Sequence, residues 1–441
     1  MINRIRQAGI IGAGGAGFPT HVKLNTQAEY ILLNGAECEP LLRVDQQLLR
    51  DHAEEILLGF EEARKLVNAS KGIVGIKGKH AEVIKSLRKT IEELNLNQLT
   101  VGILPDMYPA GDEQVLVYEL TGRVVPEASI PAAVGCVVIN AETTLNLYRA
   151  IEKSEAVTMK YVTVSGDVPN PATVKVPVGT PVLEVLSLSG RTDFTNCRVI
   201  DGGPMMGPLL SDLSGYVTKK SKGFIVLPQD HPLVVKKERE LRAAIHLNKT
   251  ACEQCRLCTD LCPRHLLGHS TAPHKMVRAL TYGQEAGESV AEALTCCQCN
   301  LCEYFSCPAG ISPKMANVKY MNELRERGIR FSPTKEAYKV SAMREYRKVP
   351  TGRLIARLGL KQYDRPAPLR EDASFAPELV CLSLTAHVGA PAKPLVKEGD
   401  EVLCGQLIAE VPESSMGACV HASVEGIVES AADGWIKIRR K

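Results

Sequence analysis

The sequence lacks any apolar run that approaches the roughly 18 residues a membrane-spanning helix needs. It also lacks a secretory signal, because the opening MINRIRQAGIIGAGGAG has no apolar segment followed by a small-residue cleavage site. Net charge is nearly absent too: 53 Lys and Arg and 50 Asp and Glu leave a formal +3. These absences exclude a membrane span and argue against binding of polyanions such as nucleic acid. We therefore expect a soluble cytoplasmic chain.

The length of 441 residues predicts about three domains at roughly 150 residues each, and 45 % apolar residues supply their cores. In the first 150 residues, strand-like runs alternate with helical stretches such as 45–69, which is typical of an α/β domain. Residues 160–230 alternate strand residues with Pro and Gly, with a short helix near Thr180, and predict a small β-rich module. The expected strands of the first domain cover residues 30–33, 72–76, 99–104 and 134–139. The predicted fold class is multidomain α/β.

The last quarter of the chain divides into a basic connector and a second β-rich module. Between residues 335 and 370, ten Lys and Arg face three Asp and Glu, an excess of +7. Two interpretations of the connector stay open: a solvated segment that packs on the other domains, or a docking surface for an acidic partner. The final residues form short strands broken by Gly-Asp and Asp-Gly turns, which predicts a compact β module.

Nine of the 15 cysteines fall between Cys252 and Cys307. In a reducing compartment, such clustered thiols are metal ligands or redox groups rather than disulfides. The first set reads C-x2-C-x2-C-x3-C-P, the bacterial ferredoxin spacing for a cubane [4Fe-4S] cluster, and the second reads C-x2-C-x2-C-x4-C-P. The spacing predicts two [4Fe-4S] clusters in residues 240–325, with ligands Cys252, Cys255, Cys258, Cys262, Cys296, Cys299, Cys302 and Cys307.

The last cysteine of each set is expected to serve the other cluster, as in two-cluster ferredoxins. Cys307 would then join the first three cysteines of the first set, and Cys262 those of the second set. Zinc is the alternative metal, although a compact run of three thiolates followed by Cys-Pro, present twice, is awkward for a zinc ribbon. Cys297 is an alternative ligand to Cys296. Residues 264–287, between the sets, are expected to be a helical spacer.

A glycine-rich loop, GAGGAGFP, opens the chain at residues 12–19. Without a Cβ, its backbone amides can approach an anion such as a phosphate. The spacing satisfies G-x-G-x-x-G, but the apolar run before it is short and Pro19 interrupts any long helix after it. A standard dinucleotide-binding unit is therefore not predicted.

Three further motifs follow this loop in order: NGAECEP at 34–40, YPAGDEQVLVYELTGR at 108–123 and INAETTLNL at 139–147. Together the four motifs resemble the FMN- and NADH-binding subunit of respiratory complex I and its relatives, which include the RnfC protein of the Rnf ferredoxin:NAD oxidoreductase. The resemblance implies FMN as a cofactor and NADH as the electron donor. Ala36, Cys38, Asp112 and Ile139 stand where the complex I pattern has Asp, Ser, Glu and Asn.

The resemblance also assigns individual residues. Glu37 is expected at the hydride-transfer face, and its alternative role is a solvated or helix-capping carboxylate. Phe18 is expected to stack on the dinucleotide, and Lys23 adds a cation beside a phosphate that amides hold. The expected FMN contacts are Gly12, Gly14, Gly15, Gly17, Lys23, Asn34, Tyr108, Gly111, Asp112, Glu113, Asn140 and Thr143.

The remaining modules resemble the same relatives. GDVPNP and GGPMMG resemble the SLBB β-grasp domain that follows the flavin domain. The C-terminal module resembles the barrel-sandwich hybrid domain of RnfC and of lipoyl and biotinyl carriers, but its hairpin at 414–418 has no lysine, so neither group is expected. The expected domains are 1–155 (FMN and NADH), 160–230 (SLBB), 240–325 (two-cluster ferredoxin-like), 326–374 (basic linker) and 375–441 (barrel-sandwich hybrid).

The order of these modules resembles the family of cobalamin reductases of propanediol-utilisation bacterial microcompartments. This resemblance implies an NADH-dependent oxidoreductase in which FMN accepts two electrons and two clusters relay them singly to cobalamin. It also implies a microcompartment location, with an adenosyltransferase and shell proteins as partners. No corrinoid motif such as D-x-H-x-x-G is present, so the resemblance alone supplies that acceptor. The alternatives are an Rnf-like or other microcompartment electron-transfer flavoprotein with a different acceptor, and a scaffold or iron-responsive sensor.

Overall fold

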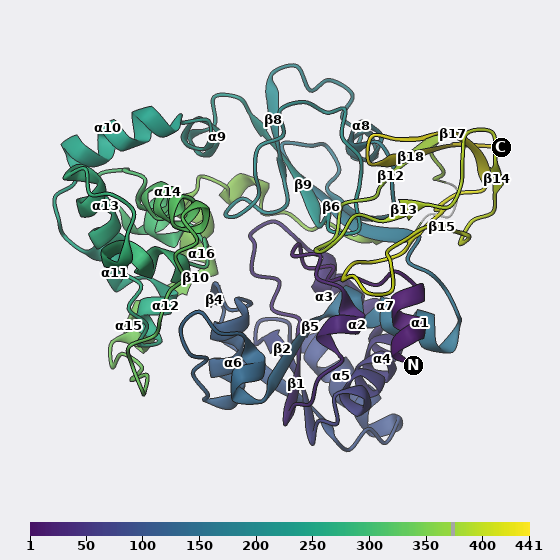
Figure 1. Cartoon of the computed structure of the whole chain (residues 1–441), viewed down its shortest axis with the longest axis horizontal. Helices are drawn as coiled ribbons and strands as arrows, with labels where there is room; N and C mark the ends of the chain where they lie inside the picture. Colours follow the sequence, from purple (N-terminus) through teal and green to yellow (C-terminus); the bar gives the residue numbers. More distant parts are fainter. Residues whose placement is uncertain (372–374) are drawn as a thin grey trace.

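The computed structural model describes residues 1–371 and 375–441 (Figure 1). In Figure 1 the helical cysteine-rich domain lies on the left and the C-terminal β module on the right, and the N-terminal α/β domain and the second, β-rich module lie between them. One hydrophobic core joins the N-terminal domain, the second module, the cysteine-rich domain and the connector, because Tyr108, Ile225, Leu301 and Leu354 belong to the same cluster of buried side chains. The core of the C-terminal module is a separate cluster, which Val178 of the second module joins.

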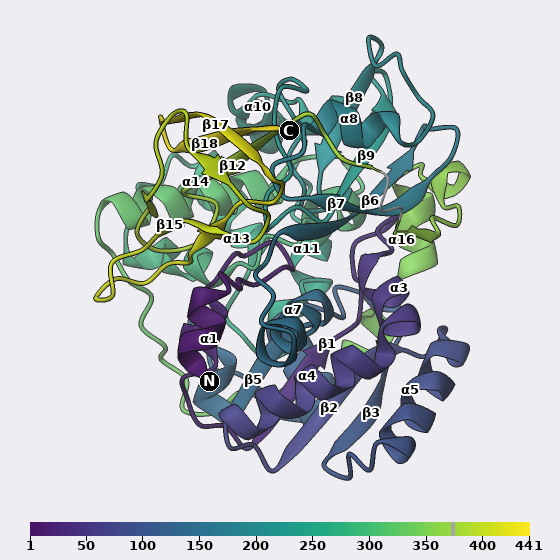
Figure 2. The same cartoon turned by 90° about the vertical axis from the view of Figure 1, so that its right-hand side faces the viewer.

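A parallel sheet in the order β3-β2-β1-β5 forms the centre of the N-terminal domain. Alternate residues of its central strand enter different cores: Ile31 and Leu33 pack on one face, and Leu32 packs on the other. The strands are β1 (Tyr30–Asn34), β2 (Lys71–Lys77), β3 (Leu99–Leu104) and β5 (Cys136–Asn140). Helices α3 (Val44–Asp51), α4 (Ala53–Leu66), α5 (Ala81–Glu93) and α7 (Ala141–Glu152) cover the first face (Figure 2). Helix α6 (Glu113–Thr121) covers the second face.

The order of the strands creates a switch point between β1 and β5. The chain runs outward from β1 through β2 to β3 and then returns to the opposite side of β1. Asn34 and Asn140, the last residues of β1 and β5, are register partners at the carboxyl edge. Ligands of open parallel sheets bind at such a point, so this edge is where a site is expected.

The local structure differs from the sequence-based prediction at three places. The expected helix 45–69 is divided at His52, whose φ of −122° and ψ of 32° are not helical, and it ends at Leu66. The expected helical spacer is two short helices, α12 (Pro263–Leu266) and α13 (Pro273–Thr281), separated at Gly268. A helix, α1 (Ile2–Gln7), precedes the glycine loop, and α2 (Thr20–Lys23) after it has one turn.

The second module is a five-stranded sheet in the order β11-β7-β6-β9-β8, and its central pair, β6 and β9, is parallel. Its strands are β6 (Met159–Gly166), β7 (Ala172–Pro177), β8 (Cys197–Asp201) and β9 (Gly223–Pro228), with helices α8 (Val182–Ser187) and α9 (Pro232–Lys237). The edge strand β11 (Leu369–Arg370) comes from the connector.

The basic connector packs on the domains around it. Its strand β10 (Val349–Pro350) pairs with β4 (Met107–Tyr108) of the N-terminal domain. Arg344 forms an ion pair with Glu119, to which Lys348 also lies close at 3.3 Å. These contacts agree with the interpretation in which the connector packs on the other domains. Its helices are α15 (Arg344–Arg347) and α16 (Thr351–Arg357).

The cysteine-rich domain is helical, with α10 (Leu241–Ala251), α11 (Leu257–Asp260), α12, α13, a 3-10 helix (Glu288–Thr295), a π-helix (Leu301–Ser306) and α14 (Pro313–Glu326). The C-terminal module has two sheets, one of β12 (Leu379–Ser383), β14 (Glu401–Val402), β17 (Gly426–Ala432) and β18 (Trp435–Arg440), the other of β13 (Lys393–Pro394), β15 (Leu407–Glu410) and β16 (Val420–His421). Across residues 1–371 and 375–441, no helix is long and apolar enough to cross a membrane.

Candidate functional site

The glycine loop lies over the ends of β1 and β5. The N–H of Ala13 donates to Thr143 Oγ1 at 2.9 Å, and a Cβ on Gly14 would stand 3.8 Å from the Asn140 side chain. Among the described residues, no protein acceptor takes the N–H groups of Gly14, Gly15 and Ala16, which are exposed. Consecutive unpaired amides form a concavity that binds anions. The loop therefore has the donors that a phosphate group needs.

Neighbouring modules hold the loop in place. The carbonyl of Gly17 accepts a hydrogen bond from the N–H of Val388 in the C-terminal module at 3.0 Å. Lys219 of the second module donates to the carbonyls of Gly9 and Cys419 at 2.8 and 2.9 Å. Phe18 closes the loop, because its carbonyl accepts from the N–H of Gly12 at 2.8 Å. Three modules therefore fix the position of one loop.

Several expected FMN contacts converge on the same edge of the sheet. Asn34 donates to the carbonyl of Gly111 at 2.9 Å, and Asn140 caps the N-terminus of α7 through its side-chain oxygen. Lys23 lies beside β5, with its Nζ 2.8 Å from Glu113 and 3.0 Å from the carbonyl of Val138. These residues and the glycine loop surround the switch point.

Glu37 has an uncommon backbone and a buried carboxyl group. Its φ of 38° is left-handed, a conformation that non-glycine residues adopt mainly where function or packing requires it. Its Oε2 accepts from the N–H of Gln46 in the first turn of α3 at 3.1 Å, which is the helix-capping role. Its Oε1 is buried without a partner among the described residues. Burial and then Asp45 raise the pKa of Glu37 to about 7.

Two of the residues expected to contact FMN, Tyr108 and Asp112, join the N-terminal domain to the cysteine-rich domain. The phenol of Tyr108 donates to the carbonyl of Cys299 at 2.9 Å. Asp112 caps α6 with one oxygen, and its other oxygen lies 2.8 Å from Arg264. Burial disfavours the charge on Arg264, but Asp112 and Cys297 together outweigh burial and raise the pKa of the guanidinium. These contacts fix the cysteine-rich domain against residues 108–112 of the N-terminal domain.

Replacing Arg264 by Met is expected to lower the free energy of unfolding by about 3 kcal/mol, because it leaves Asp112 as a nearly buried, unpaired charge. Denaturant unfolding measures this change. Arg256→Met is the matched control in the same domain, since Arg256 is exposed and its loss should change stability by less than about 0.5 kcal/mol. Equal losses in the two variants would contradict the assigned role of the ion pair.

The cysteines form two groups in space. Cys262, Cys296, Cys299 and Cys302 line one small cavity, together with Cys297. In the other group, burial raises the pKa of Cys258, and the neighbouring thiols of Cys307, Cys252 and Cys255 raise it further. Each group combines three cysteines of one motif with the last cysteine of the other motif. The ligand sets themselves stay a prediction, with Cys297 still an alternative to Cys296.

The two motifs share a backbone conformation. Gln254 and Arg256 in the first have φ of 53° and 64°, and Gln298 and Asn300, at the equivalent positions of the second, have 55° and 64°. The extra residue before Cys307 is taken up by the π-helix, since a π-helix is an α-helix with one inserted residue. The longer x4 spacing therefore leaves the local fold of the motif intact.

Glu39 is a site residue that the sequence did not reveal. Its carboxylate accepts the N–H groups of Met205 and Met206 at 2.8 and 2.9 Å, in the GGPMMG loop of the second module. A Cβ on Gly203 would stand 2.2 Å from this carboxylate, so only glycine fits there. The motif itself was visible in the sequence, but its partner lies 166 residues away.

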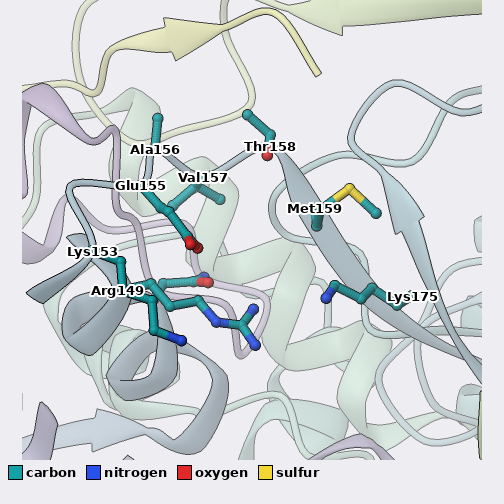
Figure 3. Close-up of a pocket in the computed structure, with 9 residues that line it drawn as sticks. Arg149, Lys153, Glu155, Ala156, Val157, Thr158, Met159 and Lys175 are labelled. Atoms are coloured by element: carbon teal, nitrogen blue, oxygen red, sulfur yellow. The ribbon is translucent and has the colours of Figure 1, made fainter. Parts of the chain in front are cut away.

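A separate cavity lies at the opposite end of α7 from the glycine loop (Figure 3). Arg149, Lys153 and Lys175 surround it. Glu55 pairs with the first two of these cations and Glu371 with the third. This cavity is therefore separate from the glycine loop and from the cysteine groups.

Models of known families match four segments of the chain. They are a Nuo51 FMN-binding domain over residues 5–149, an SLBB domain over 161–209, a 4Fe-4S dicluster domain over 251–312 and an RnfC barrel sandwich hybrid domain over 361–437. The site at the sheet edge and the cysteine groups fall in the first and third of these segments. The mixed α/β architecture is thus confirmed, as are a flavin domain and a dicluster domain.

Whole proteins are also similar to this chain. Cobalamin reductase PduS of Salmonella typhimurium is 44 % identical over 439 residues, which cover 99 % of this chain and 96 % of that protein. Its counterpart in Citrobacter freundii is 43 % identical over 442 residues, with the same coverage. A component of the proton-translocating ferredoxin:NAD(+) oxidoreductase complex of Clostridium ljungdahlii is 34 % identical over 271 residues, 60 % of this chain and 56 % of that protein.

Proposed function

The chain belongs to the family of the cobalamin reductases PduS, and from this membership we propose that it transfers electrons from NADH to cobalamin through FMN and two [4Fe-4S] clusters. The observation that carries the proposal is the 44 % identity over 99 % of the chain, which includes both the FMN-binding and the dicluster segments. The protein is accordingly an oxidoreductase.

The residues at the sheet edge fit FMN. The unpaired amides of Gly14, Gly15 and Ala16, with Lys23 nearby, would hold its phosphate. Asn34 and Asn140 would border the flavin at the switch point, where open parallel sheets bind their ligands. When bound, FMN accepts a hydride from NADH and the clusters carry single electrons, which couples a two-electron donor to a one-electron acceptor.

The residues around the cysteine groups separate an inner cluster position from an outer one. Cys299, of the second motif, is buried and accepts the hydrogen bond of Tyr108, so its group would hold the cluster nearer the flavin domain. Cys255, of the first motif, is exposed, so its group would hold the cluster nearer the solvent. Tyr108 and the Arg264–Asp112 pair keep the inner position against the flavin domain and away from water.

The proposed partners follow from the family. NADH is the donor and cobalamin the acceptor, reduced toward cob(I)alamin for an adenosyltransferase within a microcompartment. Anaerobic mixing with NADH and hydroxocobalamin tests the acceptor, and the absorbance of reduced corrinoid is the expected result. If FMN and the clusters become reduced while the corrinoid stays oxidised, the acceptor is wrong. Capture of membrane proteins rather than an adenosyltransferase would then support the Rnf-like alternative.

Glu37 gives the protein a predictable pH dependence of stability. Its pKa is raised from 4.5 to about 7 in the folded state, so the folded protein binds more protons than the unfolded chain between these pH values. The free energy of unfolding should therefore fall as pH rises from about 4.5 to 7. Glu37→Gln should remove the contribution of Glu37 to this decrease. Thermal unfolding across this range measures it. Glu93→Gln, at an exposed position of α5, is the control; the same change of slope in both variants would contradict the assignment.

A further inference from the structure

A buried network of charges crosses the interface between the N-terminal domain and the second module. The N-terminal domain supplies three carboxylates, Glu37, Asp45 and Glu142, and the second module supplies two ammonium groups, Lys160 and Lys222. Lys160 pairs with Glu142, and both side chains are almost fully buried. Two cations of the second module therefore face three acids of the N-terminal domain.

Lys222 is the member that contacts Asp45 and also lies near Glu142. Its carbonyl accepts from the N–H of Thr163 in β6 at 3.2 Å, which fixes its backbone just before β9. Its Nζ lies 2.5 Å from Asp45 Oδ1 and 4.0 Å from Glu142. Burial by itself would lower the pKa of Lys222, but the surrounding carboxylates outweigh burial and raise it. The side chain therefore stays charged.

Asp45 links this cation to the flavin edge. The same Oδ1 that binds Lys222 also accepts the side-chain N–H of Asn140 at 2.9 Å. Asn140 ends β5 and lies against Gly14 of the glycine loop. A continuous chain of contacts thus runs from Lys222 through Asp45 and Asn140 to the loop proposed to hold phosphate.

Glu37 faces the same pair. Burial and then the Asp45 carboxylate raise its pKa, whereas Lys222 and the backbone N–H groups of Gln46 and Asp45 lower it. Glu142 on α7 and Lys160 on β6 lie one step further away, as the other charges of the network. Glu37 Oε1 is buried without a partner among the described residues. The charge of Glu37 is consequently sensitive to both Asp45 and Lys222.

We propose that Lys222 is a positioning residue of the flavin site: through its ion pair it holds Asp45 against Asn140, the residue that lies beside the glycine loop. The second module thus completes the site of the N-terminal domain. This inference rests on the proposed function, since it concerns the same FMN and NADH site.

Two substitutions should move the pH profile of NADH-driven flavin bleaching in opposite directions. Lys222→Met removes the cation that favours ionised Glu37, so the limb of the profile that Glu37 controls should move to higher pH. Asp45→Asn removes the carboxylate that disfavours the ionised form of Glu37, so the same limb should move to lower pH. A purely structural defect would slow bleaching without opposite shifts. Stopped-flow absorbance under anaerobic conditions measures the profile.

Flavin affinity is the second readout. Titration of flavin-free protein with FMN, followed by flavin fluorescence, should show about tenfold weaker binding for Lys222→Met, because Asn140 loses its fixed partner. Lys222→Arg keeps the charge and should restore most of the affinity. Lys175→Met is the matched control, since this lysine of the same module pairs with Glu371 outside the network.

The outcomes separate this inference from the proposed function. If wild-type protein binds no FMN, the proposed function fails. If wild-type protein binds FMN and both Lys222→Met and Asp45→Asn keep its affinity and pH profile, the inference about Lys222 is overturned and the proposed function stands. If Lys222→Met does not fold, the other two variants test the inference. It is overturned if Asp45→Asn leaves the pH profile of bleaching unshifted, and it is supported if that profile moves to lower pH while Lys222→Arg keeps most of the FMN affinity.

Discussion

Replacing Cys262 by Ser is expected to lower the iron content from about eight to about four atoms per chain and to abolish NADH-driven reduction of cobalamin. Cys262 belongs to the first motif in sequence, yet it lines the cavity of Cys296, Cys299 and Cys302. This cavity lies against Tyr108 through the carbonyl of Cys299, so its cluster would connect the flavin domain with the rest of the chain. Iron analysis and electron paramagnetic resonance of the dithionite-reduced protein measure the loss.

Double variants test which cysteines share a cluster. If Cys262 and Cys302 serve the same cluster, Cys262→Ser with Cys302→Ser should lose no more iron than Cys262→Ser alone. Cys262→Ser with Cys258→Ser should lose almost all iron, because it affects both clusters. The reverse pattern would show that each motif fills its own cluster and would contradict the exchange of the fourth ligand. Cys381→Ser, at a buried position of β12 in the C-terminal module, is the control and should keep all the iron.

Gly14→Val is expected to weaken FMN binding by at least about a hundredfold, or roughly 3 kcal/mol, while the protein stays folded. The φ of Gly14 is not in the left-handed region, and the nearest atoms to a Cβ are 3.8 Å away on Asn140, so the fold accepts a side chain. The added methyl groups would instead occupy the space between the unpaired amides and Asn140. Titration with FMN, followed by fluorescence, measures the affinity.

Gly287→Val is the control for this substitution, because Gly287 is extended and nothing lies within 4 Å of its Cβ position. It should keep the wild-type affinity and melting temperature. If Gly14→Val binds FMN as tightly as the wild type, the phosphate does not bind at the amides of the glycine loop. Loss of affinity together with a melting temperature far below that of Gly287→Val would point to unfolding instead.

The sequence predicted those features that local patterns determine. The four strands of the N-terminal domain lie within three residues of their expected bounds, because each is an apolar run between turns. The cysteine motifs are contiguous, so their spacing identified a dicluster domain. The helix break at His52 was missed, because residues 45–69 contain no Pro and only one Gly. That residue, Gly59, lies within α4 and packs against Thr144 of α7.

The features that join the domains could not be predicted in the same way. Glu39 binds a loop 166 residues away, Lys222 lies 177 residues from Asp45, and Arg264 lies 152 residues from Asp112. Each pair exists only after the domains pack, so no local pattern marks it. The same packing explains why Tyr108 and Asp112, expected at the flavin, bind the cysteine-rich domain.

The most direct test of the account is an anaerobic NADH titration of purified protein of known iron and flavin content, with and without hydroxocobalamin. The account predicts about eight irons and about one FMN per chain, bleaching of the flavin and cluster absorbance by NADH, and recovery of that absorbance as reduced corrinoid forms. Protein that contains these cofactors but is not bleached by NADH would contradict the central claim that one chain carries electrons from NADH to its acceptor.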